Sequence, residues 1–177
     1  MSGTPDPGPL RDAVPLRHAL ATLAYRAGKA LRDAPEGFAD FRLAPGARTP
    51  LQIVAHLADL MDWSARSLDG AWSWQAGGAS DWDGATGRFY AALAALDRAL
   101  AAREATGEGP EIDAAVLFQG PIADALTHVG QLAMLRGAAG AGLRPESFVK
   151  AEIRVGRVGP DQAEPVRLFD GDASAPA

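Results

Sequence analysis

The stretch that decides the fold runs from Thr49 to Leu68 and reads TPLQIVAHLADLMDWSARSL. Thr49 is suited to cap a helix, Pro50 to take its first position, and Gln52 to complete a capping box. The apolar residues that follow recur at three- and four-residue steps, the spacing of one helical face. This pattern predicts a helix that continues to about Leu68 and ends at Gly70. Its inward stripe is predicted to consist of Ile53, Leu57, Leu60 and Ser64.

Three further segments have the same helical periodicity. The first spans about 12–33, and the second starts near Ser80, whose hydroxyl is suited to cap it. The third begins at Gly120-Pro121, with proline in the first helical position, and runs to about Gly137. In the second segment the buried ridge is predicted to be Phe89, Leu93, Leu96 and Leu100. Four amphipathic helices without a strong strand pattern predict an all-α fold, a four-helix bundle.

The segment from Ser147 to Val158 differs from the rest because its apolar and charged residues alternate. We expect a short strand or an extended arm across the helices, since a lone strand forms no sheet. The predicted organisation is therefore a flexible N-terminal tail over 1–10, a bundle domain over 11–160 with an extended or irregular end, and a flexible tail over 161–177.

Composition excludes several classes of function. The 177 residues contain no cysteine, which rules out thiolate metal sites, disulfides and cysteine nucleophiles within the chain. The net charge is −5 and the basic residues are scattered, so no nucleic-acid partner is expected. No apolar run reaches membrane-spanning length, so neither a signal peptide nor a membrane partner is expected. A cytoplasmic location follows as the default expectation.

Two of the three histidines lie where a solvated residue is not expected. His56 follows Ile53 by three residues and therefore shares its inward face. In the last helix Asp124, His128 and Gln131 are spaced by four and three, so they form one stripe. A polar group buried without a partner costs roughly 1–3 kcal/mol, so these groups are expected to satisfy one another.

Two interpretations of this polar cluster remain open. In the first, His56, Asp124 and His128 hold one metal ion between two helices and leave coordination positions for water or substrate. In the second, Asp124 only accepts a hydrogen bond from His128. Asp59 is expected to be a rim or outer carboxylate and the first substitute for Asp124, and Gln131 is expected to orient a ligand.

Other candidate residues have simpler interpretations. His18 is expected to be a surface or boundary residue, because it lies off the centre of its apolar stripe. The four tryptophans gather around the connection between the second and third helices, and are interpreted as a core plug or buried bundle end, with a ligand-pocket wall or a dimer contact as the alternative. Trp63 follows His56 by seven residues, which makes it the best candidate to line the pocket. The cluster consists of Trp63, Trp72, Trp74 and Trp82.

The sequence resembles the DinB-like superfamily of bacterial bundle proteins, which is unrelated to the DNA polymerase of the same name. The likeness rests on TPLQIVAHL at 49–57 and on DALTHVGQL at 124–132. The order of the helices extends it over about 16–159. The resemblance implies a four-helix bundle, often a homodimer, with a divalent metal held by one histidine of the second helix and two of the fourth.

Carried over by position, those ligands are His56, Asp124 and His128. The family usually has histidine where this chain has Asp124. Aspartate still binds zinc, nickel, iron or manganese, so two outcomes follow. Either the site keeps its metal with a harder ligand set, or the metal is lost and the pocket remains as a hydrogen-bonded relic.

Two functional hypotheses follow. The first is a metal-dependent transferase or hydrolase that acts on a small molecule, and the resemblance implies a thiol-dependent reaction. In this hypothesis Arg136, Lys150 or Arg154 attracts an acidic substrate. The alternative is a non-catalytic dimeric bundle that binds a small molecule or a partner and has lost the metal.

Overall fold

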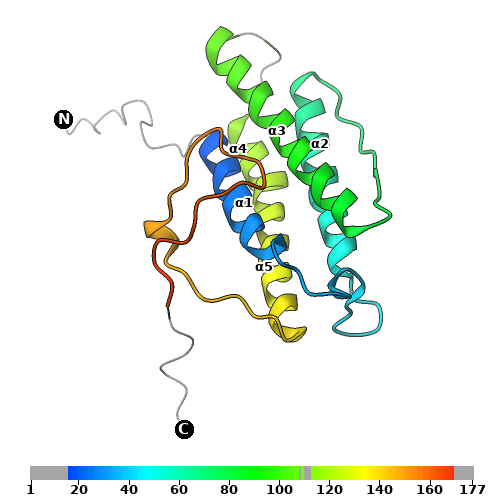
Figure 1. Cartoon of the computed structure of the whole chain (residues 1–177). Coiled ribbons are helices and arrows are strands. Elements are labelled where there is room, and N and C mark those ends of the chain that lie inside the picture. The colour runs from blue at the N-terminus through cyan, green and yellow to red at the C-terminus, as the bar shows by residue number, and fades with distance from the viewer. Residues whose placement is uncertain (1–15, 108, 110–112, 170–177) are drawn as a thin grey trace, which may run out of the picture.

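The computed structural model describes residues 16–107, 109 and 113–169. Within these ranges the chain is helical and contains no β-strand, so the all-α prediction is confirmed. The helices are α1 (Leu16–Leu31), α2 (Pro50–Leu68), α3 (Trp82–Thr106), α4 (Ala114–Leu117) and α5 (Ala123–Ala138), with a π-helical turn η2 (Phe118–Ile122) between the last two (Figure 1). Two short 3-10 turns are η1 (Phe38–Asp40) and η3 (Phe148–Lys150).

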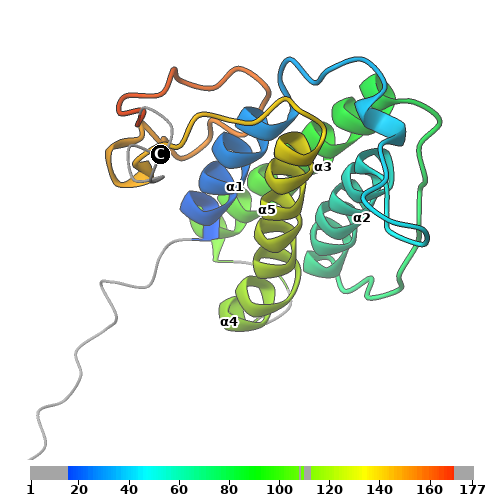
Figure 2. The ribbon, with the colours of Figure 1, turned by 90° about the horizontal axis from the view of Figure 1, so that it is seen from below.

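The four long helices form a closed ring of contacts around one core. α1 packs on α3, α3 on α2, α2 on α5, and α5 on α1, and Figure 2 shows the four side by side. Such a ring buries one apolar face of every helix, as expected of a four-helix bundle. The stripes predicted for α2 and α3 are all buried. Among the described residues, no helix is both long and apolar enough to traverse a bilayer.

The start of α2 is the one predicted from its sequence. The Thr49 hydroxyl accepts a hydrogen bond from the Gln52 backbone N–H at 3.2 Å, and the Gln52 side-chain oxygen accepts one from the Thr49 backbone N–H at 2.9 Å. Pro50 occupies the first helical position, where its missing N–H has no consequence. This cap fixes where α2 begins, and therefore which face His56 occupies.

The start of α3 differs by one residue from the prediction. The cap is Asp81, whose carboxylate accepts a hydrogen bond from the Gly84 N–H at 2.7 Å. Ser80 instead donates its hydroxyl to Asp81. A carboxylate gains more than a hydroxyl from the positive end of a helix, which explains the difference.

The predicted start of the last helix at Gly120-Pro121 is wrong. The chain becomes helical at Ala114, where the Asp113 carboxylate accepts from the Ala115 N–H. Pro121 lies inside η2, and the helix continues through it into α5. A π-helical turn shifts the hydrogen-bond ladder by one residue, which accommodates a proline without ending the helix.

The C-terminal segment, residues 139–169, lies over α1. Within the described residues it is neither a strand nor a loose tail. Residues 161–169, expected to be flexible, return alongside 145–147: the Ser147 N–H donates to the Arg167 carbonyl and the Phe169 N–H to the Pro145 carbonyl. In Figures 1 and 2 this segment lies on the α1 side of the bundle. The alternating pattern misplaced Val149, which is 91% exposed. Residues 1–10 and 170–177, the remainder of the predicted tails, lie outside the described ranges.

The segment is attached to α1 by a buried carboxylate. Glu146 accepts hydrogen bonds from the Tyr25 hydroxyl at 2.5 Å and from the Lys29 ammonium at 2.8 Å. The Glu146 side chain is fully buried, so its charge depends on these two partners. The hydrophobic core consists mainly of residues from the four long helices, but Val158 from this segment also contributes.

The central ridge of α3 is expected to contribute strongly to stability. Leu93 is fully buried in the core. Leu93→Ala should lower the free energy of unfolding by about 2–5 kcal/mol, because the substitution leaves a cavity. Val149→Ala, at a nearly fully exposed position, should change it by less than about 0.5 kcal/mol. Urea unfolding followed by circular dichroism measures both, and equal effects would contradict this description of the core.

Candidate metal centre

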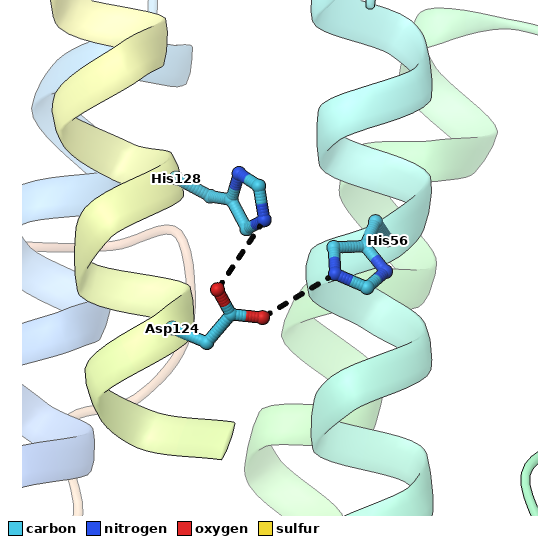
Figure 3. A group of neighbouring side chains, drawn as sticks. All are labelled: His56, Asp124 and His128. Atoms are coloured by element: carbon cyan, nitrogen blue, oxygen red, sulfur yellow. Dashed lines mark ion pairs between the residues drawn. The ribbon is translucent and has the colours of Figure 1, made fainter. Parts of the chain in front are cut away.

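The polar cluster predicted from the sequence forms at the contact between α2 and α5. Figure 3 shows the Asp124 carboxylate between the two imidazole rings. Asp124 Oδ2 lies 3.4 Å from His56 Nε2, and Asp124 Oδ1 lies 3.5 Å from His128 Nε2. One potential ligand atom from each of the three residues lies within 4.8 Å of the other two. α5 supplies two of these side chains because residues four apart share a helical face.

The three side chains of the cluster differ in solvent exposure. His128 is buried, the His56 side chain is 23% exposed, and the Asp124 side chain is 45% exposed. The two rings stand edge to face, with their centroids 4.9 Å apart. The cluster therefore opens to solvent on the side of its carboxylate and is closed behind by the core of the bundle.

Gln131 orients His128, as the sequence predicted. The Gln131 side-chain oxygen lies 2.7 Å from His128 Nδ1. An amide oxygen only accepts hydrogen bonds, so this contact favours the His128 tautomer that carries its proton on Nδ1. In the neutral ring the lone pair is then on Nε2, the atom that faces Asp124. This arrangement is typical of a metal-binding histidine held by an outer hydrogen bond.

The spacing of the three donors suits one divalent ion. Metal–ligand bonds of about 2.0–2.1 Å in a tetrahedral site separate neighbouring ligand atoms by about 3.3–3.4 Å. The nitrogen–oxygen distances of 3.4 and 3.5 Å are close to that value, but each involves a different oxygen of Asp124, and one ligand atom from each of the three residues lies within 4.8 Å of the others. Two imidazoles and one carboxylate also leave coordination positions for water or a substrate, as in catalytic rather than structural sites.

The cluster lines a hollow of about 580 Å³, which is large enough for a small molecule. Polar side chains are gathered at the cluster, and apolar side chains form much of the remaining wall. The lining residues outside the cluster include Leu43, Arg48, Ile53, Met134 and Leu135.

Electrostatics favour the neutral form of His56. Burial of its ring lowers the pKa of His56 below its usual value, and the positive charge of Arg48, and that of His128 when it is protonated, act in the same direction. Asp124 opposes this shift, since a carboxylate favours the protonated ring. A neutral imidazole is the form that binds a metal ion.

Asp59 does not join the cluster. Its carboxylate is buried and accepts hydrogen bonds from Arg88 at 2.6 Å and from the Gly77 N–H at 2.9 Å. Arg88 also donates to the carbonyl of Ala55. Asp59 is expected to substitute for Asp124 only if Asp124 points away; Asp124 points into the cluster, and Arg88 from α3 pairs with the Asp59 charge. Asp59 instead fastens the connection between α2 and α3 onto α2.

That connection places a different tryptophan at the cluster from the one predicted. The Trp74 ring lies 5.8 Å from the His56 ring, whereas Trp63 packs on Trp72 and donates its indole N–H to the Trp72 carbonyl. Seven residues of helix advance about 10 Å along the axis, which takes Trp63 away from His56. The interpretation as a core plug is wrong for Trp72 and Trp74, which are each 48% exposed, whereas Trp82 packs against the core.

The basic residues proposed to attract a substrate lie away from the cluster. Arg136 is buried and donates to the carbonyls of Ala30 and Arg32, so it ties α5 to α1. Lys150 and Arg154 belong to the C-terminal segment, and none of the three lines the hollow.

The basic residue at the cluster is Arg48, which the sequence analysis missed. Its position directly before the Thr49 cap was the available signal, since that cap starts the helix that carries His56. His18 is partly buried, which agrees with the boundary position predicted for it.

The chain matched no protein-family model, no curated protein and no solved structure in comparisons with all three. The DinB-like resemblance therefore stays a prediction.

The clamp formed by Asp59, Arg88 and Gly77 leaves no room for a side chain on the glycine. A Cβ on Gly77 would lie 2.5 Å from the Arg88 guanidinium. Gly77→Ala should therefore release the connection over 71–80 and speed hydrogen exchange of its amides. Gly87→Ala, on open helix surface, should leave that exchange unchanged. Equal protection of 71–80 in both variants would show that the clamp is dispensable.

The lowered pKa of His56 predicts the direction in which the stability of the metal-free protein changes with pH. The folded state binds the His56 proton more weakly than the unfolded chain, so this contribution to stability is present above the unfolded-state pKa. It is lost as the pH falls toward the folded-state pKa. Titration of the ring by NMR should give a midpoint below that of the unfolded chain. Asp124→Asn should lower it further. A raised midpoint would contradict this account.

Proposed function

We propose that the protein binds one divalent metal ion through His56, Asp124 and His128 and acts as a metal-dependent enzyme on a small molecule. The observation that carries the proposal is the convergence of these three donors within 4.8 Å from two helices. The DinB-like resemblance predicts the same positions. Zinc, nickel, iron and manganese all accept such a mixed imidazole and carboxylate ligand set.

The internal hydrogen bonding of the cluster favours a cation over a simple polar contact. In the tautomer that the Gln131 oxygen favours, His128 carries its proton on Nδ1, and the unprotonated Nε2 faces Asp124 Oδ1 at 3.5 Å. Two acceptors that face each other need a positive charge between them, either a proton or a metal ion. A charge-assisted hydrogen bond would bring nitrogen and oxygen to about 2.7–2.9 Å. Both observed distances are longer than that.

The proposed roles follow from the position of each side chain. His56, Asp124 and His128 would hold the ion, and Gln131 would keep His128 in the ligating tautomer. When bound, such an ion polarises a substrate oxygen or lowers the pKa of a coordinated water or thiol. The hollow beside the cluster supplies room for a small substrate.

The reaction class is proposed as transfer or hydrolysis. A thiol-dependent transferase is the form that the resemblance implies. Since the chain contains no cysteine, the thiol would be a separate small molecule. The homodimer and the cytoplasmic location stay predictions as well. The alternative, a small-molecule-binding or interaction bundle without metal, is separated from this proposal by metal content.

Metal content is therefore the decisive measurement. Purified protein reconstituted with zinc, nickel, iron or manganese should contain close to one ion per chain by elemental analysis. His56→Ala and His128→Ala should lose most of this metal, because each removes a ligand, while His18→Ala should keep it. Gln131→Leu should weaken binding about 10- to 100-fold, as loss of an outer hydrogen bond does.

Circular dichroism would establish that each variant is folded. A folded wild-type chain that takes up none of these metals would leave the metal-free binding bundle as the function.

A further inference from the structure

Arg48 lies where two hollows of the protein meet. The hollow at the metal centre has a volume of about 580 Å³, and a second one of about 690 Å³ lies on the other side of His56. Arg48, Ala47 and His56 line both. A group bound by Arg48 is therefore beside the proposed metal ligands from either hollow.

The Arg48 guanidinium has no partner among the residues that the structure describes. No hydrogen bond or ion pair joins it to another described side chain, and the residue is exposed. Other arginines nearby are engaged: Arg88 pairs with Asp59, and Arg42 donates to the Ala47 carbonyl. A guanidinium offers donors in a fixed fork that matches a carboxylate. Arg48 is thus available for an anion that enters the hollow.

The rim of the same hollow is apolar. Leu43 is 56% exposed and Met134 is 59% exposed, and both line it together with Ile53 and Leu135. Large apolar side chains left in water beside a polar centre are typical of a site that receives the apolar part of a ligand. Methionine also adapts to ligands of different shape.

We infer that the substrate is an organic anion, a carboxylate with an apolar body. Arg48 binds its carboxylate, and its apolar body lies against Leu43 and Met134. The inference rests on the proposed function, because it describes what reaches that metal. A divalent ion held by one aspartate leaves a net positive charge, and together with Arg48 it makes this corner attractive to anions despite the net charge of −5.

The test uses zinc-loaded full-length protein and hexanoate as the probe, with 1-hexanol as the uncharged counterpart. Hexanoate binding is followed by calorimetry, and hexanol binding by ligand-detected NMR. Arg48→Gln should weaken hexanoate binding about 10- to 100-fold, the loss expected for a charge-assisted hydrogen bond. It should leave hexanol binding unchanged, and Arg48→Lys should recover part of the loss. Arg154→Gln removes the same charge from an arginine that pairs with Glu152 outside the hollow, and should have no effect.

The apolar half of the inference has its own variant. Leu43→Ser should weaken both hexanoate and hexanol, because both use the apolar rim. Equal hexanoate affinity in wild type and Arg48→Gln would overturn the inference, since the carboxylate would then bind the metal alone. Absence of hexanoate binding at millimolar concentration would overturn it too.

Metal content, measured in every variant, separates the two proposals. If wild type and Arg48→Gln contain the same amount of zinc and bind hexanoate with the same affinity, the anion site alone is overturned. A wild-type chain without zinc would overturn the proposed function, whereas hexanoate binding that still depends on Arg48 in that chain would support the anion site.

Discussion

The candidate centre depends on the packing of α2 against α5. This contact brings His56 opposite Asp124 and His128, which lie 68 and 72 residues further along the chain. Apolar burial supplies the force for the contact, since Leu57 and Leu132 are fully buried beside the polar groups. The polar side chains lie at the solvent edge of this interface. Their position there lets them be held by the core and still reach a ligand.

α2 separates two polar clusters with different chemistry. His56 faces α5, and Asp59, three residues later, pairs with Arg88 of α3. In the second cluster the aspartate charge is neutralised by a guanidinium, so its carboxylate serves structure. In the first cluster Asp124 meets two imidazoles and no guanidinium. The different partners explain why only one of these two carboxylates is free to bind a metal ion.

The two clusters are linked through the connection between α2 and α3. Asp59 accepts from Gly77 and so fixes the segment whose Trp74 ring lies against His56. On the opposite side of the bundle, the buried Glu146 fastens the C-terminal segment to α1. The bundle therefore has long connections anchored by carboxylates, and one of them places the Trp74 ring beside His56.

The sequence by itself determined the four long helices except the start of the last one, the cap of α2, and the helical faces that carry His56, Asp124, His128 and Gln131. These features depend on spacing within one helix, and helical periodicity is a local property. Only the tertiary structure decided that Arg88 pairs with Asp59, that Trp74 and not Trp63 lies beside His56, and that Arg48 lines the hollow. Each of these depends on which distant segment lies opposite a helical face, and the period of one helix carries no information about its partner.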